Sequence, residues 1–231
     1  MLTREKINLV NILVLCYFLA AFVEVFADYL MYEPLALISR IATPLLLLIL
    51  YNLSIEKSNP LVYTLFILLL LTNVLFFYKN SPYYFLAILI SVLQRMVMLF
   101  IVLQMVTDKK YTYSLIAALP FLLIFYYLNS ITSEFALIEF NALFFQSILV
   151  SLLGGISLSG YLKNDNRQNS WLLISTLLFI GLQFVIFIEK YFFTVISLRV
   201  FGLIGALLSS FGFFTFYKFA TAADRKERNY L

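Results

Sequence analysis

Histidine is absent from this 231-residue chain, and cysteine occurs only once, at Cys16. Without histidine the chain has no imidazole for zinc or haem ligation, for a serine or cysteine catalytic triad, or for a proton switch near neutral pH. A single cysteine excludes an intramolecular disulfide. We therefore expect neither a metal site nor a cofactor.

Charged residues are also scarce, at 12% of the chain, whereas hydrophobic residues make up 63% and the mean hydropathy is +0.98. A water-soluble domain carries about 25% charged residues and cannot hide this much apolar surface. The composition excludes a soluble globular protein, a disordered chain and a nucleic-acid-binding protein. It indicates an all-α polytopic helix bundle in a membrane.

Eight apolar segments approach or exceed the roughly 20 residues that a helix needs to cross the hydrocarbon layer. They are continuous rather than alternating, which argues against β-strands of a membrane barrel. The predicted spans are Asn8–Tyr29, Pro34–Leu53, Leu61–Tyr78, Pro82–Val106, Tyr111–Leu128, Phe135–Tyr161, Trp171–Ile188 and Phe192–Phe219. The shortest predicted connection is Glu189–Tyr191, read as a tight turn between the last two spans.

The positions of lysine and arginine orient these spans, because cytoplasmic loops are rich in both residues. Of the 16 such residues, Lys79 and Lys190 lie on one side, and Arg40, Arg95 and Arg199 lie within spans. The other eleven lie on the opposite side: Arg4, Lys6, Lys57, Lys109, Lys110, Lys163, Arg167, Lys218, Arg225, Lys226 and Arg228. We therefore expect both termini in the cytoplasm, with the first span retained rather than cleaved as a signal peptide. The expected location is a bacterial inner (cytoplasmic) membrane.

Ionisable and amide side chains within the spans are the candidate functional residues, since such groups are costly in a bilayer. Most fall in the exoplasmic half or near mid-depth. The candidate ligand-binding residues are Arg40, Asn73, Gln94, Arg95, Gln183 and Arg199. Their candidate charge partners are Glu24, Asp28, Glu139 and Glu189.

Two interpretations of this distribution remain open. In one, the arginines line a polar cavity that opens toward the exoplasmic side and holds an anionic group such as a lipid phosphate. In the other, Arg40, Arg95 and Arg199 pair with the embedded carboxylates and lock the helices together. Arg95 is the best single marker of a cavity, because it lies too deep to reach the interface cheaply.

Small residues at four-residue spacing mark close helix contacts, as in Ser151–Gly155 and Gly202–Ala206. We interpret them first as packing within the bundle, with homo-oligomerisation as the alternative.

An internal repeat is suggested by residues 65–80 and 176–191, which are both apolar and carry one amide, Asn73 or Gln183. The single membrane domain, residues 1–231, would then consist of two parallel four-helix halves, residues 1–107 and 108–231.

The second span contains SRIATPLLLLILY, with Arg40 shortly before Pro44 and its following leucines. The third carries Thr72-Asn73, the fourth carries Gln94, and the seventh reads LFIGLQ, ending at Gln183. At these residues the chain resembles the YhhN family, whose characterised members are lysoplasmalogenases. Those proteins are eight-helix membrane enzymes that hydrolyse the vinyl-ether bond of lysoplasmalogens.

The chain departs from the family pattern at three positions. The family has an aspartate where Asn73 stands, a histidine where Gln94 stands and an aspartate where Gln183 stands. An amide has no titratable proton for acid–base catalysis. The resemblance therefore implies a YhhN-like protein without the family's catalytic groups, which binds a lipid or amphiphile.

Two alternatives remain beside this hypothesis. One is a divergent lysoplasmalogenase-type hydrolase of lysolipid vinyl ethers, with an embedded carboxylate as its general acid. The other is a structural subunit of a larger membrane complex. The expected partners are membrane lipids, together with a second membrane protein or a second copy of the chain under the latter alternative.

Overall fold

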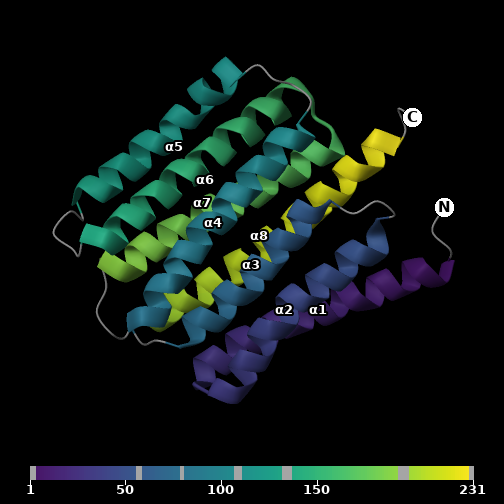
Figure 1. Cartoon of the computed structure of the whole chain (residues 1–231), viewed down its shortest axis with the longest axis horizontal. Coiled ribbons are helices and arrows are strands. Elements are labelled where there is room, and N and C mark those ends of the chain that lie inside the picture. The colour runs from purple at the N-terminus through teal and green to yellow at the C-terminus, as the bar shows by residue number, and fades with distance from the viewer. Residues whose placement is uncertain are drawn as a thin grey trace.

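The computed structural model describes residues 4–55, 59–78, 81–106, 111–131, 137–191 and 198–228. Within these residues the chain forms eight α-helices (Figure 1). They are α1 (Arg4–Leu30), α2 (Glu33–Ser54), α3 (Pro60–Phe77), α4 (Ser81–Met105), α5 (Tyr111–Ile131), α6 (Leu137–Lys163), α7 (Arg167–Tyr191) and α8 (Leu198–Arg228). All eight are long and apolar enough to cross a bilayer, which confirms the predicted fold class.

The largest differences from the predicted spans concern the helix ends of the last two segments. α7 begins at Arg167 rather than near Trp171, because the Asn166 side chain caps it by accepting a 2.9 Å hydrogen bond from the Asn169 backbone N–H. The helix also continues through Glu189–Tyr191, so the prediction of a tight turn at these residues is wrong. The predicted starts of the sixth and eighth spans, at Phe135 and Phe192, lie outside the described residues.

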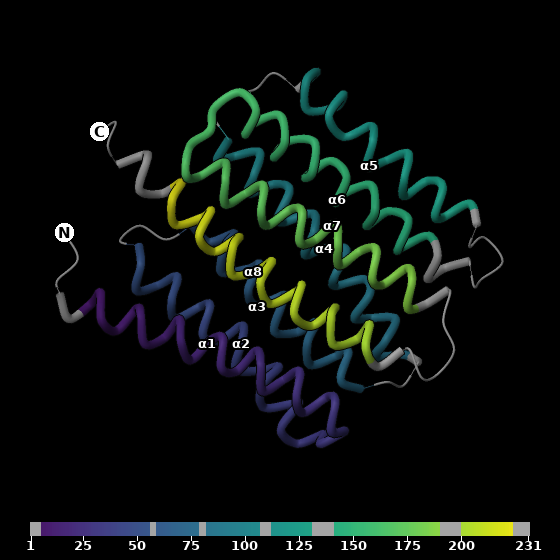
Figure 2. The backbone as a smooth tube through the Cα atoms, turned by 180° about the vertical axis from the view of Figure 1, so that it is seen from behind, coloured from purple at the N-terminus to yellow at the C-terminus, as the bar shows by residue number. Residues whose placement is uncertain are grey.

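Seven of the helices pack side by side in the order α1, α2, α3, α4, α6, α7, α8, and α8 closes the arrangement against α1. α5 lies outside this ring and packs mainly against α6. Figures 1 and 2 show α5 along one edge of the bundle and the α1–α2 pair along the other.

The first and last helices bring both ends of the chain to the same end of the bundle (Figure 2). We call this the termini end. α2, α4 and α6 finish there and α3, α5 and α7 begin there, so consecutive helices run in opposite directions. Lys6, Lys163 and Arg167 belong to this end, in agreement with the positive charge expected on the cytoplasmic side.

The turn between α1 and α2 is set by a left-handed residue, Met31, with φ of 56°. The Tyr32 N–H donates to the Ala27 carbonyl at 2.9 Å, and the Met31 N–H donates to the Asp28 carbonyl at 3.3 Å. This is the Schellman arrangement that ends many helices, here with methionine in the position that glycine usually takes. The turn folds α2 back along α1 and so brings Asp28 within hydrogen-bonding distance of Arg40 of α2.

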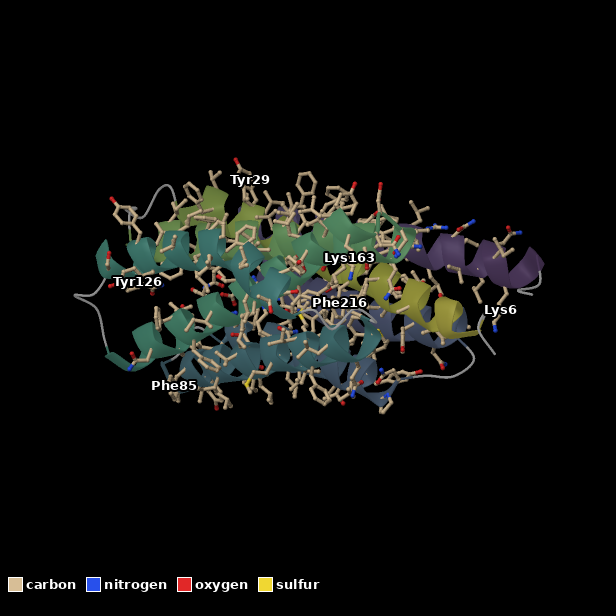
Figure 3. The ribbon with its side chains drawn as sticks, turned by 90° about the horizontal axis from the view of Figure 1, so that it is seen from above. Lys6, Tyr29, Phe85, Tyr126, Lys163 and Phe216 are labelled. Atoms are coloured by element: carbon tan, nitrogen blue, oxygen red, sulfur yellow. The ribbon has the colours of Figure 1, made fainter. Side chains whose placement is uncertain are left out.

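Aromatic side chains of α8 belong to the main hydrophobic core, namely Phe213, Phe216, Tyr217 and Phe219. Figure 3 shows Phe216 within the bundle. Two tyrosine hydroxyls are satisfied within it. The Tyr17 hydroxyl donates to the Ser210 carbonyl at 2.7 Å, and the Tyr217 hydroxyl lies 2.7 Å from Ser54 Oγ. These contacts join α8 to α1 and α2, so the ring is closed by polar as well as apolar contacts.

Small residues of α6 allow α5 to approach closely. A Cβ built on Gly155 would overlap the Ser114 carbonyl oxygen and would lie 2.6 Å from Ala118 Cβ. Beside this contact the Ser114 and Ser159 hydroxyls hydrogen-bond at 2.7 Å. Gly155 is therefore used for packing inside the bundle, as the first interpretation of the small-residue spacing predicts.

We predict opposite effects for two glycine-to-alanine substitutions in α6. Gly155→Ala should lower the free energy of unfolding by about 1–3 kcal/mol, because its Cβ overlaps α5 backbone. Gly160→Ala should leave stability unchanged or raise it by up to ~1 kcal/mol through helix propensity, since its nearest neighbour would be Asn169 at 3.9 Å. Reversible unfolding in detergent measures both. Equal effects would contradict the close α5–α6 contact.

Candidate functional site

Arg40 of α2 is held by two carboxylates of α1. Its Nη2 donates to Asp28 Oδ2 at 2.7 Å, and its Nε lies 3.5 Å from Glu24 Oε1. Glu24 and Asp28 are four residues apart and share one face of α1. The three side chains are 11–27% exposed, so the cluster is largely removed from its surroundings. For Arg40 the structure shows the ion-pair arrangement.

Asn73 of α3 joins this cluster through the backbone carbonyl of Arg40. Its Nδ2 donates to the Arg40 carbonyl at 3.0 Å. Arg40 thus receives contacts from α1 through its side chain and from α3 through its carbonyl. The two interactions hold the first three helices together in the half of the bundle away from the termini.

Gln94 and Arg95 lie buried near the middle of α4, with 2% and 4% of their surface exposed. The Arg95 guanidinium carbon stacks 3.9 Å above the centre of the Phe179 ring, and Nη1 contacts Met98 Sδ at 3.3 Å. Within the described residues, Arg95 Nε and Gln94 Nε2 have no hydrogen-bond partner, and no carboxylate forms an ion pair with Arg95. Arg95 is stabilised by aromatic rings of α7 and α8 rather than by a counter-charge.

Gln183 of α7 is also buried, at 1% exposure, and it bonds to α6. Its Nε2 donates to Ser147 Oγ at 3.2 Å. Further along the same interface, Ser157 Oγ and Thr176 Oγ1 are 2.6 Å apart. Gln183 therefore belongs to a row of polar contacts between neighbouring helices.

Asn73 and Gln183 occupy corresponding places in the suggested repeat but do not meet. Each donates to the helix that precedes its own, α2 for Asn73 and α6 for Gln183. The proposed division into two four-helix halves stays a prediction.

The remaining three candidates are less fully placed. Glu139 lies on α6 and Arg199 on α8, and the side chains of both lie outside the part that the structure describes. Glu189 is half-buried near the end of α7, with Oε1 3.9 Å from a Cβ built on Gly202 of α8. Among the described side chains Glu189 forms no ion pair.

The structure therefore places the candidates in separate groups: Arg40 with Glu24, Asp28 and Asn73; Arg95 with Phe179; and Gln183 with Ser147. Arg40, Asn73 and Gln183 have partners within the bundle, whereas Gln94 Nε2 and Arg95 Nε have no hydrogen-bond partner among the described residues. The cavity expected in the exoplasmic half stays a prediction.

A pocket of about 650 Å³ does lie in the described part of the chain, at the termini end between α4, α5, α6 and α7. Its lining combines apolar side chains with amides, hydroxyls and one lysine. The lining residues are Met105, Val106, Tyr113, Ser114, Ile116, Ala117, Ile156, Leu158, Ser159, Gly160, Leu162, Lys163, Asn164, Asn166, Gln168 and Asn169. None of them is among the candidate ligand-binding residues predicted from the sequence, because those candidates are ionisable and amide residues within the spans.

Amide side chains of α7 build the polar wall of this pocket. Asn169 Nδ2 donates to the carbonyls of Gly160 and Asn164, at 3.0 and 2.8 Å. Gln168 Nε2 donates to the Met105 carbonyl at 3.2 Å. These bonds attach the end of α4 and the end of α6 to the start of α7. The polar run YLKNDNRQNS is the sequence signal that could have located the site.

In comparisons with known proteins, no family model matches this chain, and neither a curated protein nor a solved structure is significantly similar to it.

The two embedded arginines should respond differently to substitution. Arg40→Met leaves Glu24 and Asp28 without their cation and should destabilise the protein by about 2 kcal/mol, less than a fully buried pair because the cluster is partly exposed. Arg95→Met leaves no described carboxylate unpaired and should cost under ~1.5 kcal/mol or stabilise the fold. Unfolding in detergent measures both. A larger loss for Arg95→Met than for Arg40→Met would overturn this assignment.

Proposed function

We propose that this multi-pass membrane protein binds a lipid or another amphiphile in the pocket at the termini end. The observation that supports the proposal is the mixed lining of the pocket, which joins apolar side chains to a polar wall at one end of the bundle. Its volume lies within the roughly 300–1,000 Å³ of small-molecule sites. An amphiphile carries the same two kinds of surface, so both parts of the lining would be matched.

Part of the apolar lining is also well exposed. Tyr113, Ile116 and Leu162 line the pocket, and each side chain is more than half exposed. A hydrocarbon chain could therefore enter from the bilayer without crossing a polar layer. We expect the polar wall at the level where lipid headgroups meet water, because α6 ends and α7 begins there.

Internal partners in the other half of the bundle favour this location. Arg40 is engaged by Glu24 and Asp28, and Gln183 by Ser147. A headgroup bound to Arg40 or to Gln183 would have to displace one of these contacts. We therefore place binding at the termini end rather than in the exoplasmic half, where the sequence predicted it.

Binding rather than hydrolysis fits the residues of the pocket. Among the described residues the lining holds no aspartate or glutamate, and the sequence has no histidine, so the described lining offers neither a carboxylic acid nor an imidazole to protonate a vinyl ether. A YhhN-like protein without hydrolytic activity is accordingly the preferred form of the proposal, ahead of a divergent hydrolase or a structural subunit.

A pair of tryptophan substitutions on α5 tests the proposal. Ala117 lines the pocket, so Ala117→Trp should fill it and reduce the lipid retained through detergent purification at least several-fold. Leu115, 56% exposed and outside the lining, provides the matched control, and Leu115→Trp should retain the wild-type amount. Mass spectrometry of the extracted lipid measures both, with thermal unfolding as the check of folding.

Equal lipid content in two folded variants would contradict binding in this pocket. Loss of lipid from both variants would point to a general effect of bulk on α5 and would equally argue against the proposed site.

A further inference from the structure

Gln94 and Arg95 of α4 place polar atoms inside the bundle that no described side chain satisfies. The two residues are 2% and 4% exposed, and neither lines the pocket at the termini end. The geometry points to an enclosed site at these residues for one small monovalent anion, of the size and chemistry of chloride. The inference does not depend on the proposed function, because it concerns a different part of the bundle.

The guanidinium of Arg95 has one edge without a partner. Its Nη1 contacts Met98 Sδ at 3.3 Å, and its carbon lies 3.9 Å from the centre of the Phe179 ring. Nε belongs to the other edge and has no hydrogen-bond partner among the described residues. On that edge of an arginine, Nε and Nη2 donate side by side, and such paired N–H groups bind anions.

The positive charge of Arg95 also needs compensation. A guanidinium stays protonated inside a protein, and buried charges are normally paired. The face of Phe179 recovers part of the free energy that the cation loses on leaving water, but a single aromatic contact does not recover all of it. An anion at the Nε edge supplies the remaining stabilisation.

The carboxylates of α1 and α7 do not serve as this counter-charge. Those of α1 are engaged by Arg40. Glu189 of α7 forms no ion pair among the described side chains. It lies between two and three helical turns beyond Phe179, so it is about 15 Å along the axis from the ring that Arg95 contacts.

Glu139 of α6 lies too far along the bundle as well. Gln183 bonds to Ser147, and α6 and α7 run in opposite directions, so this bond sets their register. Phe179 then lies about one turn nearer the termini end than Ser147, whereas the backbone of Glu139 lies about two turns further from that end. Three turns correspond to roughly 16 Å, which is more than a glutamate side chain spans.

Gln94 provides the second donor of the site. Its Nε2 is buried and has no hydrogen-bond partner among the described residues. Gln94 and Arg95 both belong to the buried side of α4, as do Ser91 and Met98. Buried polar atoms are normally satisfied by protein, by water or by an ion. Two sets of N–H donors beside a positive charge suit an anion, and the near-complete burial suits a small one.

Thermal unfolding of the purified full-length protein in a neutral detergent tests the inference. We would compare NaCl with sodium gluconate at equal ionic strength, because gluconate is too large for an enclosed site. An ion that binds the folded state alone raises the unfolding midpoint. We expect the midpoint in chloride to be higher by roughly 2 °C or more.

Three variants assign this difference to the site. Arg95→Met should abolish it, and Gln94→Met should reduce it. Arg40→Met is the matched control, because Arg40 is also an embedded arginine but is engaged by carboxylates. The Arg40→Met protein should therefore keep the difference between the two salts.

Bromide locates the site without any variant, and it decides the matter if Arg95→Met fails to fold. Crystals grown with NaBr should show the anomalous signal of a bromide beside Arg95 Nε. Absence of that signal, equal midpoints in chloride and gluconate, or a full difference in the folded Arg95→Met or Gln94→Met protein would overturn the inference. Each of these results would leave the proposed function standing.

Discussion

A polar side chain within the hydrocarbon layer has no water to bond with, so it must find its partner inside the bundle. The rest of this structure depends on that constraint. Arg40 meets it with two carboxylates, Gln183 with the Ser147 hydroxyl, and Arg95 with the face of Phe179. The contacts of Arg40 and Gln183 join neighbouring helices, and that of Arg95 joins α4 to α7, while Gln94 Nε2 and Arg95 Nε have no hydrogen-bond partner among the described residues.

The constraint relaxes where the helices reach the interface. There the chain can place amides and a lysine beside apolar side chains at no comparable cost, because water and lipid headgroups satisfy what the protein leaves open. The pocket between α4 and α7 uses this freedom. A functional residue of a membrane protein is often sought at mid-depth, but the pocket that we propose for lipid binding lies at the termini end.

The helices themselves could be predicted from the sequence, because continuous apolar runs of this length are typical of membrane-spanning helices. The shared face of Glu24 and Asp28 follows from their spacing, and Arg40 as their partner was one of two interpretations. Helix ends were harder to predict. The cap at Asn166 lengthens α7 at its start, and the helix continues through Glu189–Tyr191 where a turn was expected.

The pocket could not be predicted, since it depends on how closely Gly155 lets α5 approach and on contacts between distant residues such as Gln168 and Met105.

The central claim is that accessible polar surface lies at the termini end and not in the opposite half. Thiol accessibility tests it most directly, because the lone Cys16 can be replaced by alanine and single cysteines introduced as Ser159→Cys or Gln183→Cys. Membrane vesicles of both orientations would be treated with a membrane-impermeant maleimide. We expect the cysteine at position 159 to react from the side of the termini and the cysteine at position 183 to react from neither side. Labelling at position 183 from the exoplasmic side, with position 159 protected, would contradict the central claim.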